Sequence, residues 1–269
     1  MKVLLVVFGS VVVVVLLLWA GLRVPSPPYD ALVAPEAEPE LLPLPDGLPA
    51  PVDRFYREVY GDQVPVVDTA VITGRGTMRV NGVTLPVRFR FSHLAGRDYR
   101  HEMETTLYGL RVLSIDETFL DGTGRLELPF GVSEGPEVDQ GANLALWSEA
   151  VWMPSVWVTD PHARWEPVDD HTALLVVPFG EQEEVFVARF DPATGLLRLF
   201  ESMRFKGEDA TSKTLWLNEV AGWGDLGERR LPIETEVTWF DDGRPWARLT
   251  TEDVRYNVPL TDELRPAPG

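Results

Sequence analysis

The stretch that decides the fold of this chain reads Gly135-Pro-Glu-Val-Asp-Gln-Gly-Ala-Asn-Leu-Ala-Leu-Trp-Ser-Glu-Ala-Val-Trp-Met-Pro154. It is the one long helical pattern in the interior of the sequence. Asp139 is expected to cap the helix at its N-terminus and Pro154 to stop it. Because its apolar face is wide, we expect this helix to be buried inside the fold. Its apolar residues recur at spacings of three and four, the period of a helix face: Leu144, Leu146, Trp147, Ala150, Val151 and Met153.

Glu149 falls on the apolar side of this helix, between Leu146 and Met153. A carboxylate at such a position needs a partner or a raised pKa, since burial disfavours its charge. One interpretation is an ion pair with an arginine, or hydrogen bonds from backbone amides. The other is an acid that contacts a ligand or takes part in catalysis. The sequence favours the first interpretation and leaves the second open.

Most of the remaining folded chain is typical of strands joined by tight turns. Alternating apolar residues run from about Val71 to Phe130 and from Arg164 to Asn257, and Asn81-Gly82 and Asp121-Gly122 are hairpin turn signals. Strands at such short intervals predict antiparallel pairing. The predicted fold is therefore mainly β (α+β): a large curved antiparallel sheet or incomplete β-barrel of about 10–12 strands. A central buried helix and a short amphipathic helix at residues 51–60 complete it.

The composition excludes several classes of function. The 269 residues carry a formal net charge of −18, and so acidic a chain repels nucleic acid. There is no cysteine, which excludes disulfides, thiolate zinc sites and lipid-modified cysteines. No Walker, dinucleotide-binding, serine-hydrolase or zinc-protease motif occurs. We therefore predict no catalytic residue, no cofactor, and a protein that is not an enzyme.

The four histidines do not have the spacing of a metal site. His162 and His171 are separated by turn residues, and His101 and Glu102 are strand neighbours that face opposite ways. Together with His93, these histidines are predicted to be structural or surface residues. The sequence therefore predicts no bound metal.

The N-terminal region is not typical of a globular domain. Val3 to Leu22 is an almost wholly apolar run, and about 20 residues is the length that crosses a bilayer core. A stretch rich in proline and acidic residues follows. The predicted organisation is a transmembrane anchor at 1–23, a proline-rich acidic linker at 24–50 and a single β-rich domain at 51–269. With Lys2 before the apolar run, the expected location is the cytoplasmic membrane, single-pass, with the C-terminal domain extracytoplasmic.

Parts of the chain resemble an uncharacterised bacterial membrane-anchored family, a domain of unknown function. The segments that carry the resemblance are Pro136-Glu-Val-Asp-Gln-Gly141, Glu149-Ala-Val-Trp-Met-Pro154, Trp165-Glu-Pro-Val-Asp-Asp170 and the motif Leu48-Pro-Ala-Pro-Val52. The resemblance covers nearly the whole chain after Gly47 and implies no established activity. The order of strands and helix is also similar to that of the outer-membrane lipoprotein carrier and receptor fold. That likeness implies a curved, incomplete barrel with an apolar cavity for acyl chains, and fold alone does not settle function.

Tryptophans gather in and just after the central helix, where they either fill a core or line an apolar pocket. The function expected is a non-catalytic protein of the cell envelope that binds a lipid or another apolar small molecule in the concave face of the sheet. The alternative is a structural or interaction module of the envelope with a filled core. The membrane is an expected contact through the N-terminal helix, nucleic acid is not, and protein partners stay open. The predicted ligand-binding set is Trp147, Glu149, Val151, Trp152, Trp157 and Trp165.

Overall fold

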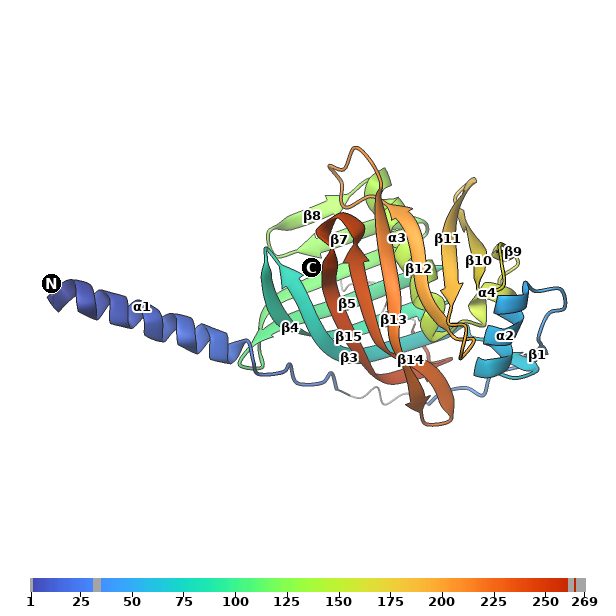
Figure 1. Ribbon diagram of the computed structural model, residues 1–269, viewed down its shortest axis with the longest axis horizontal. Helices are drawn as coiled ribbons and strands as arrows, with labels where there is room; N and C mark the ends of the chain where they lie inside the picture. Colours follow the sequence, from blue (N-terminus) through green and yellow to red (C-terminus); the bar gives the residue numbers. More distant parts are fainter. Residues whose placement is uncertain (1, 31–34, 261–263, 265–269) are drawn as a thin grey trace.

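A computed structural model describes residues 2–30, 35–260 and 264 of the chain. In this part of the chain, thirteen strands form one antiparallel sheet, and the short strands β1 and β2 pair separately. Figure 1 shows the large sheet curving around a helix. The strands of the large sheet are β3 (Thr69–Val80), β4 (Val83–Leu94), β5 (Asp98–Leu107), β6 (Leu110–Leu120), β7 (Thr123–Leu128), β8 (Gly131–Glu134), β9 (Arg164–Pro167), β10 (Thr172–Phe179), β11 (Gln182–Phe190), β12 (Leu197–Arg204), β13 (Thr214–Leu226), β14 (Arg229–Trp239) and β15 (Arg244–Tyr256).

The strand order places the first and last of these strands side by side in the middle of the sheet. The order is β8-β7-β6-β5-β4-β3-β15-β14-β13-β12-β11-β10-β9. The chain runs by hairpins from β3 to the edge strand β8, crosses to the opposite edge at β9, and returns by hairpins to β15. β15 pairs with β3 from Ala247 opposite Met78 to Tyr256 opposite Ala70. This β3–β15 seam joins the two halves of the sheet.

The predicted β class and curved antiparallel sheet are confirmed, with one difference in strand count. The edge strands β8 and β9 have four residues each. Strands this short do not show a measurable period in the sequence. The hairpin between β3 and β4 is as predicted, since Asn81 and Gly82 both have positive φ, at 48° and 82°.

The segment that crosses between the two edges is helical and lies on the concave side of the sheet. α3 (Pro136–Glu149) continues into the 3-10 turn η1 (Ala150–Trp152) and then, after a bend, into α4 (Val156–Thr159). Every residue of α3 from Gln140 to Ser148 is buried. This confirms the predicted central buried helix.

The limits of α3 differ from the predicted ones. The helix begins at Pro136, one full turn before the expected start, because a proline at the first position has φ already fixed for a helix. Asp139 is therefore inside the helix, where its carboxylate accepts a hydrogen bond from the Gly124 amide at 2.7 Å. The α-helix ends at Glu149, before Pro154 is reached.

The short amphipathic helix expected at the start of the domain is α2 (Ala50–Val59). Its buried face includes Val52, Phe55 and Tyr56. The Tyr56 hydroxyl donates to the Pro154 carbonyl at 2.7 Å, which ties α2 to the bend after η1. α2 therefore covers one end of the curved sheet, beside β9 and β10 (Figure 1).

The described part of residues 24–50 contacts the sheet at several points. Within it, β1 (Leu41–Pro43) pairs with β2 (Gln63–Pro65). Ser26 is buried and shares a hydrogen bond with Thr106 at 2.8 Å. The Tyr29 ring lies beside the guanidinium groups of two arginines of β4. The proposed boundaries between linker and domain stay a prediction.

The predicted location of the chain is corrected by the structure. Residues 2–21 form the helix α1 (Lys2–Gly21), yet among the described residues no helix has the combination of length and apolar character needed to cross a membrane. This contradicts the transmembrane anchor at 1–23 and the single-pass membrane location with an extracytoplasmic domain. The last turn of α1 is instead bound to the β5–β6 hairpin, where the Tyr108 amide donates to the Gly21 carbonyl at 3.0 Å and the Tyr108 hydroxyl donates to the Leu17 carbonyl.

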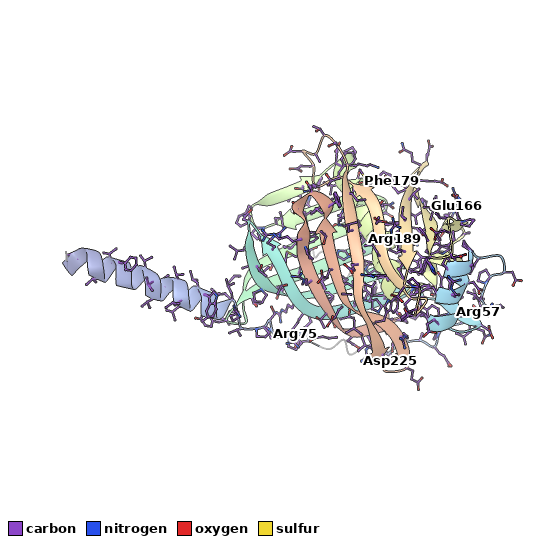
Figure 2. The ribbon with its side chains drawn as sticks, viewed as in Figure 1. Arg57, Arg75, Glu166, Phe179, Arg189 and Asp225 are labelled. Carbon is purple, nitrogen blue, oxygen red and sulfur yellow. The ribbon has the colours of Figure 1, made fainter. Side chains whose placement is uncertain are left out.

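The outer face of the sheet carries charged side chains, many of them in ion pairs across neighbouring strands. Arg75 pairs with Glu252, and Arg189 pairs with Glu201. Figure 2 shows Arg75, Arg189 and Asp225 among these outward side chains. Much of the charge of the chain thus lies on the outside of the sheet, and most of the concave face is apolar.

The β3–β15 seam depends on glycine at position 76. A Cβ atom there would lie 2.0 Å from the Arg248 carbonyl oxygen of β15, and backbone cannot move away without opening the seam. We expect Gly76→Ala to lower the free energy of unfolding by about 1–3 kcal/mol, measured by urea denaturation. Gly207→Ala is the control, since nothing lies within 4 Å of that position. A Gly76→Ala protein as stable as this control would contradict the close packing of the seam.

Candidate functional site

The concave face of the sheet is only partly filled by α3 and η1. A cavity of about 110 Å³ remains between these helices and strands from both halves of the sheet. Most of its lining is apolar, and polar side chains from α3 and from strands of both halves complete it. The apolar lining includes Phe91, Met103, Val151, Trp152, Leu197, Phe200, Val220 and Leu249.

This cavity adjoins a wider hollow that opens at the surface. The outer hollow has a volume of about 870 Å³ and lies between the β3–β4 turn, α3 and the ends of β12 and β14. Four residues line both spaces: Met103, Glu117, Arg204 and Trp246. The inner cavity therefore ends at these four side chains, and the outer hollow begins there.

Three of the six residues predicted to bind a ligand line the inner cavity: Glu149, Val151 and Trp152. Trp152 is held in place by its ring nitrogen, which donates to the Thr251 hydroxyl at 2.9 Å and to the Pro232 carbonyl at 3.2 Å. These bonds fix the indole as one wall of the cavity.

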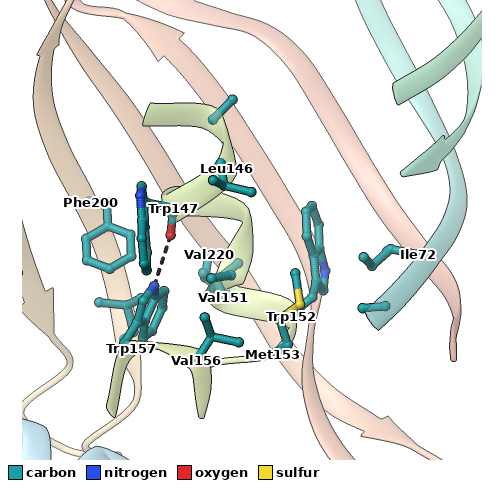
Figure 3. Close-up of a cluster of buried hydrophobic side chains, with 14 of the residues drawn as sticks. Ile72, Leu146, Trp147, Val151, Trp152, Met153, Val156, Trp157, Phe200 and Val220 are labelled. Atoms are coloured by element: carbon teal, nitrogen blue, oxygen red, sulfur yellow. Dashed lines mark hydrogen bonds between the residues drawn. The ribbon is translucent and has the colours of Figure 1, made fainter. Parts of the chain in front are cut away.

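The other three predicted residues lie away from that cavity. The Trp157 ring nitrogen donates to the Trp147 carbonyl at 3.0 Å, as Figure 3 shows, and both side chains are fully buried. Trp157 also packs edge-on against Phe200 and Trp165, with ring centroids 5.1 and 5.8 Å apart. Trp147 lines a separate hollow on the other side of α3. A ligand-binding role for all six residues stays a prediction, and Trp157 and Trp165 are placed to fill core.

Glu149 has the partner that its position requires, but the partner is a pair of histidines and not an arginine. Glu149 Oε2 lies 3.1 Å from His93 Nε2 and 2.6 Å from His101 Nε2. Behind His101, Glu117 Oε2 is 3.9 Å from His101 Nδ1. The Tyr99 hydroxyl donates to Glu117 Oε1 at 2.7 Å. Five side chains from β4, β5, β6 and α3 thus form one buried polar cluster.

The electrostatics of the cluster follow from burial and from opposite charges at short range. Burial alone would lower the pKa of His101, but the carboxylates of Glu149 and Glu117 raise it to about 9. Burial alone would raise the pKa of Glu149, but His101 and His93 lower it to about 2. Burial lowers the pKa of His93. The cluster therefore holds an ionised Glu149 and a protonated His101 beside a neutral His93.

The sequence contained a signal for this histidine pair. The β4–β5 hairpin places Phe91 opposite His101 and His93 opposite Tyr99, so the two histidines are diagonal neighbours on the concave face. Alternate side chains of β4 face the interior, so His93 lies on the same face as Phe91. Including His93 in this alternation would have placed it next to His101. The approach of Glu149 could not be found this way, because it depends on how α3 sits inside the sheet.

Arg204 is the second feature that sequence reasoning missed. Its guanidinium lies 4.3 Å from the centre of the Trp216 ring, at the boundary between the inner cavity and the outer hollow. Within the described part of the chain, Arg204 makes no hydrogen bond or ion pair, and its Nε is buried without a partner. Its positive charge is near enough to Glu117 to lower the pKa of that carboxyl, but the two groups form no ion pair, so the guanidinium is able to bind an anionic group.

The Glu149–His101 pair makes stability depend on pH. The contribution of His101, whose folded pKa is raised, is complete below about 6.5 and is lost as the pH rises through about 9. The contribution of Glu149, whose folded pKa is lowered, is complete above about 4.5 and is lost as the pH falls through about 2. We expect Glu149→Gln to lower the free energy of unfolding by about 3 kcal/mol near pH 5.5, and by progressively less as the pH rises past 9.

This expectation is tested by urea denaturation of the full chain across that pH range, with a chelator present. The other titratable groups facing the pair are His93, Glu117, Tyr99 and Arg204, and all are unchanged in the variant. Glu181→Gln in the exposed β10–β11 turn is the matched control. Equal stability of Glu149→Gln and the parent near pH 5.5, or a difference that does not change up to pH 10, would contradict the account.

Comparisons with known proteins give a family and a set of similar structures. The family described as "Family of unknown function (DUF6544)" matches residues 41–249. No protein of curated function matches the chain.

Among solved structures, a LolA superfamily protein from Nitrosomonas europaea is 10% identical with a TM-score of 0.44, over 82% of this chain and 96% of that one. A DUF1329 family protein from Desulfovibrio piger is 12% identical with a TM-score of 0.42, over 73% of this chain and 89% of that one. The expected membership of an uncharacterised family is confirmed, since the match spans well over half of the sequence: the chain belongs to the family of unknown function DUF6544.

Proposed function

We propose that this protein binds an amphiphilic ligand, an apolar chain with an acidic head group, on the concave face of its sheet, and that it does so without catalysis. The observation that carries the proposal is the position of Arg204. This cation, which forms no ion pair, lies where the inner, mainly apolar cavity meets the open hollow. An amphiphile needs both environments side by side, an apolar space for its chain and a cation for its head group.

The sizes of the two spaces agree with a ligand that occupies both. The inner cavity of about 110 Å³ is below the ~300–1,000 Å³ of typical ligand pockets, and the outer hollow of about 870 Å³ falls within that range. A small apolar cavity still binds a compact apolar group, as an engineered cavity of ~150 Å³ binds benzene. The inner cavity therefore accommodates the end of an apolar chain, and the outer hollow accommodates the rest.

The aromatic walls favour the same ligand. Trp152, Phe91 and Phe200 surround the inner cavity, and Trp239 and Trp246 line the outer hollow. Burying an apolar chain against such walls gives roughly 25 cal/mol for each Å² removed from water. The head group would then meet the guanidinium of Arg204, which forms paired hydrogen bonds to a carboxylate or phosphate.

A second candidate function is a structural or interaction module without a ligand. It is favoured by the tight packing around Trp147 and Trp157, where buried aromatic side chains fill the interior on one side of α3. The two candidate functions differ in what they imply for the inner cavity. A structural module without a ligand gives no reason for an apolar cavity to lie beside an arginine that has no ion-pair partner.

The proposal is tested by titrating the full chain with a fluorescent long-chain fatty acid and with its methyl ester. We expect saturable binding of both, detected by energy transfer from the tryptophans. Val220→Phe should abolish binding of both, because it fills the inner cavity, which Val220 lines. Arg204→Gln should weaken binding of the acid about tenfold or more, the equivalent of one lost charged hydrogen bond, and leave the ester unchanged.

Arg198→Gln is the matched control for the charge, because Arg198 lies on the same strand and is exposed to solvent. Circular dichroism checks that each variant is folded. A parent protein that binds neither ligand would leave the structural module as the function. Equal binding by Val220→Phe and the parent would place the ligand elsewhere and contradict the proposed site.

A further inference from the structure

Three donor atoms converge at the inner end of the cavity. They are His93 Nε2 from β4, His101 Nε2 from β5 and one carboxylate oxygen of Glu149 from α3, and all lie within 4.8 Å of one another. His93 and His101 are almost completely buried, and Glu149 is largely so. The three residues come from elements far apart in the sequence, and two antiparallel strands and a packed helix hold them together.

The hydrogen-bonding capacity of these atoms is not used by the protein. Glu149 Oε2, both ring nitrogens of His93 and Nε2 of His101 are buried and have no hydrogen-bond partner in the part of the chain that is described. Glu149 Oε2 lies 3.1 Å from His93 Nε2 and 2.6 Å from His101 Nε2, so these atoms meet as charged groups and not as assigned hydrogen-bond partners. Buried polar atoms without partners are rare in proteins and call for an explanation. Three of them, one from each residue, lie close together and indicate a group that binds them together.

The surroundings of His101 have the arrangement that orients a metal-binding imidazole. Its Nε2 faces Glu149, and its Nδ1 faces the carboxylate of Glu117, which is fixed by the Tyr99 hydroxyl. Imidazoles that bind metals usually direct their second nitrogen at a carboxylate in this way. The Tyr99 ring stacks on His101 at 3.9 Å between centroids, which restricts the rotation of the imidazole.

The charges of the cluster favour a cation as well. The carboxylates of Glu149 and Glu117 give two negative charges, and Arg204 attracts Glu117 without forming an ion pair with either. A divalent cation among the three donors would balance these charges without any protonated histidine. Two imidazoles and a carboxylate are donors suited to first-row transition metals such as zinc and iron.

We propose that His93, His101 and Glu149 bind a divalent first-row transition-metal ion, of which Zn²⁺ is the probe, at the inner end of the cavity. Metal–nitrogen and metal–oxygen bonds of about 2.1 Å in a tetrahedron separate the donors by about 3.4 Å. His93 and Glu149 already have nearly this separation, at 3.1 Å, and a small rotation of the Glu149 carboxylate brings His101 to it. His101 and Glu149 also line the cavity, so the proposed site lies next to it.

This inference is independent of the proposed amphiphile, because it rests on different side chains. An ion with a free position could bind a donor atom of a ligand or a water molecule. The spacings along the chain predicted no metal site, and such spacings do not reveal donors that meet across strands. The proposed site does not include the two exposed histidines, His162 and His171.

The test uses the full chain, stripped with a chelator and titrated with Zn²⁺ by calorimetry. We expect one ion per chain. His93→Ala and His101→Ala should weaken binding by more than a hundredfold, and Glu117→Gln, which acts through His101, by about ten- to a hundredfold. His162→Ala should leave the affinity unchanged. A parent that binds no zinc, or zinc binding that persists in His101→Ala, would overturn the proposal.

A second measurement does not depend on the folding of any variant. X-ray absorption at the zinc edge of the loaded parent protein reports the ligands directly. Two imidazole nitrogens with carboxylate oxygen in the first coordination sphere would support the site. Coordination by oxygen alone, or by a single imidazole, would show that zinc binds on the acidic surface and would overturn the proposal.

Discussion

α3 is buried along most of its length inside a curved sheet, and most other features of the structure depend on that burial. A helix in this position cannot hydrogen-bond its polar side chains to water, so the sheet must supply partners. Gln140 donates to the Met203 carbonyl at 2.9 Å and Asn143 to the Pro178 carbonyl at 3.1 Å, both on the C-terminal half of the sheet. Asp139 accepts from Gly124 and Glu149 meets the histidines, both on the N-terminal half. α3 therefore bridges the two halves, which also meet at the β3–β15 seam.

The same helix divides the interior into a filled side and an open side. Trp157 and Trp165 fill the space towards α2, where Phe55 and Phe190 complete an aromatic cluster. On the other side, η1 turns Trp152 towards β4 and β15, and the wide curvature of the sheet leaves a cavity. Glu117 of the polar cluster and Arg204 both lie where this open side meets the outer hollow. One side of α3 is therefore a packed core, and the other side contains a cavity. The structural-module alternative describes the first side, and the ligand-binding alternative describes the second.

Much of the fold followed from local patterns. The buried helix, the amphipathic helix at the start of the domain and the glycine turns all depend on residues close in sequence, whose periods and φ preferences are local properties. The four-residue edge strands escaped notice because a period needs more residues than they have. The apolar run at the N-terminus has the composition expected of a membrane span, but composition does not show that its last turn binds Tyr108.

The candidate site was less accessible to sequence reasoning. Glu149 could be recognised as a buried charge in need of a partner, since its helix phase is a local property. Its partners could not, because they depend on how far the sheet curves around α3. Arg204 lies at the end of an ordinary alternating strand, and only the tertiary structure shows that it lacks a counterion. Contacts between side chains from distant elements are therefore the part of the site that could not be predicted from the sequence.

The central claim is that the open side of the interior is a binding site and not a packing defect. Native mass spectrometry of the full chain, purified under non-denaturing conditions from its own cells, tests this most directly. The account predicts a population heavier than the polypeptide and any bound ion by the mass of one amphiphile, which fragmentation identifies as an acidic lipid or fatty acid. A single species with the mass of the bare polypeptide, or with no adduct other than an ion, would contradict it.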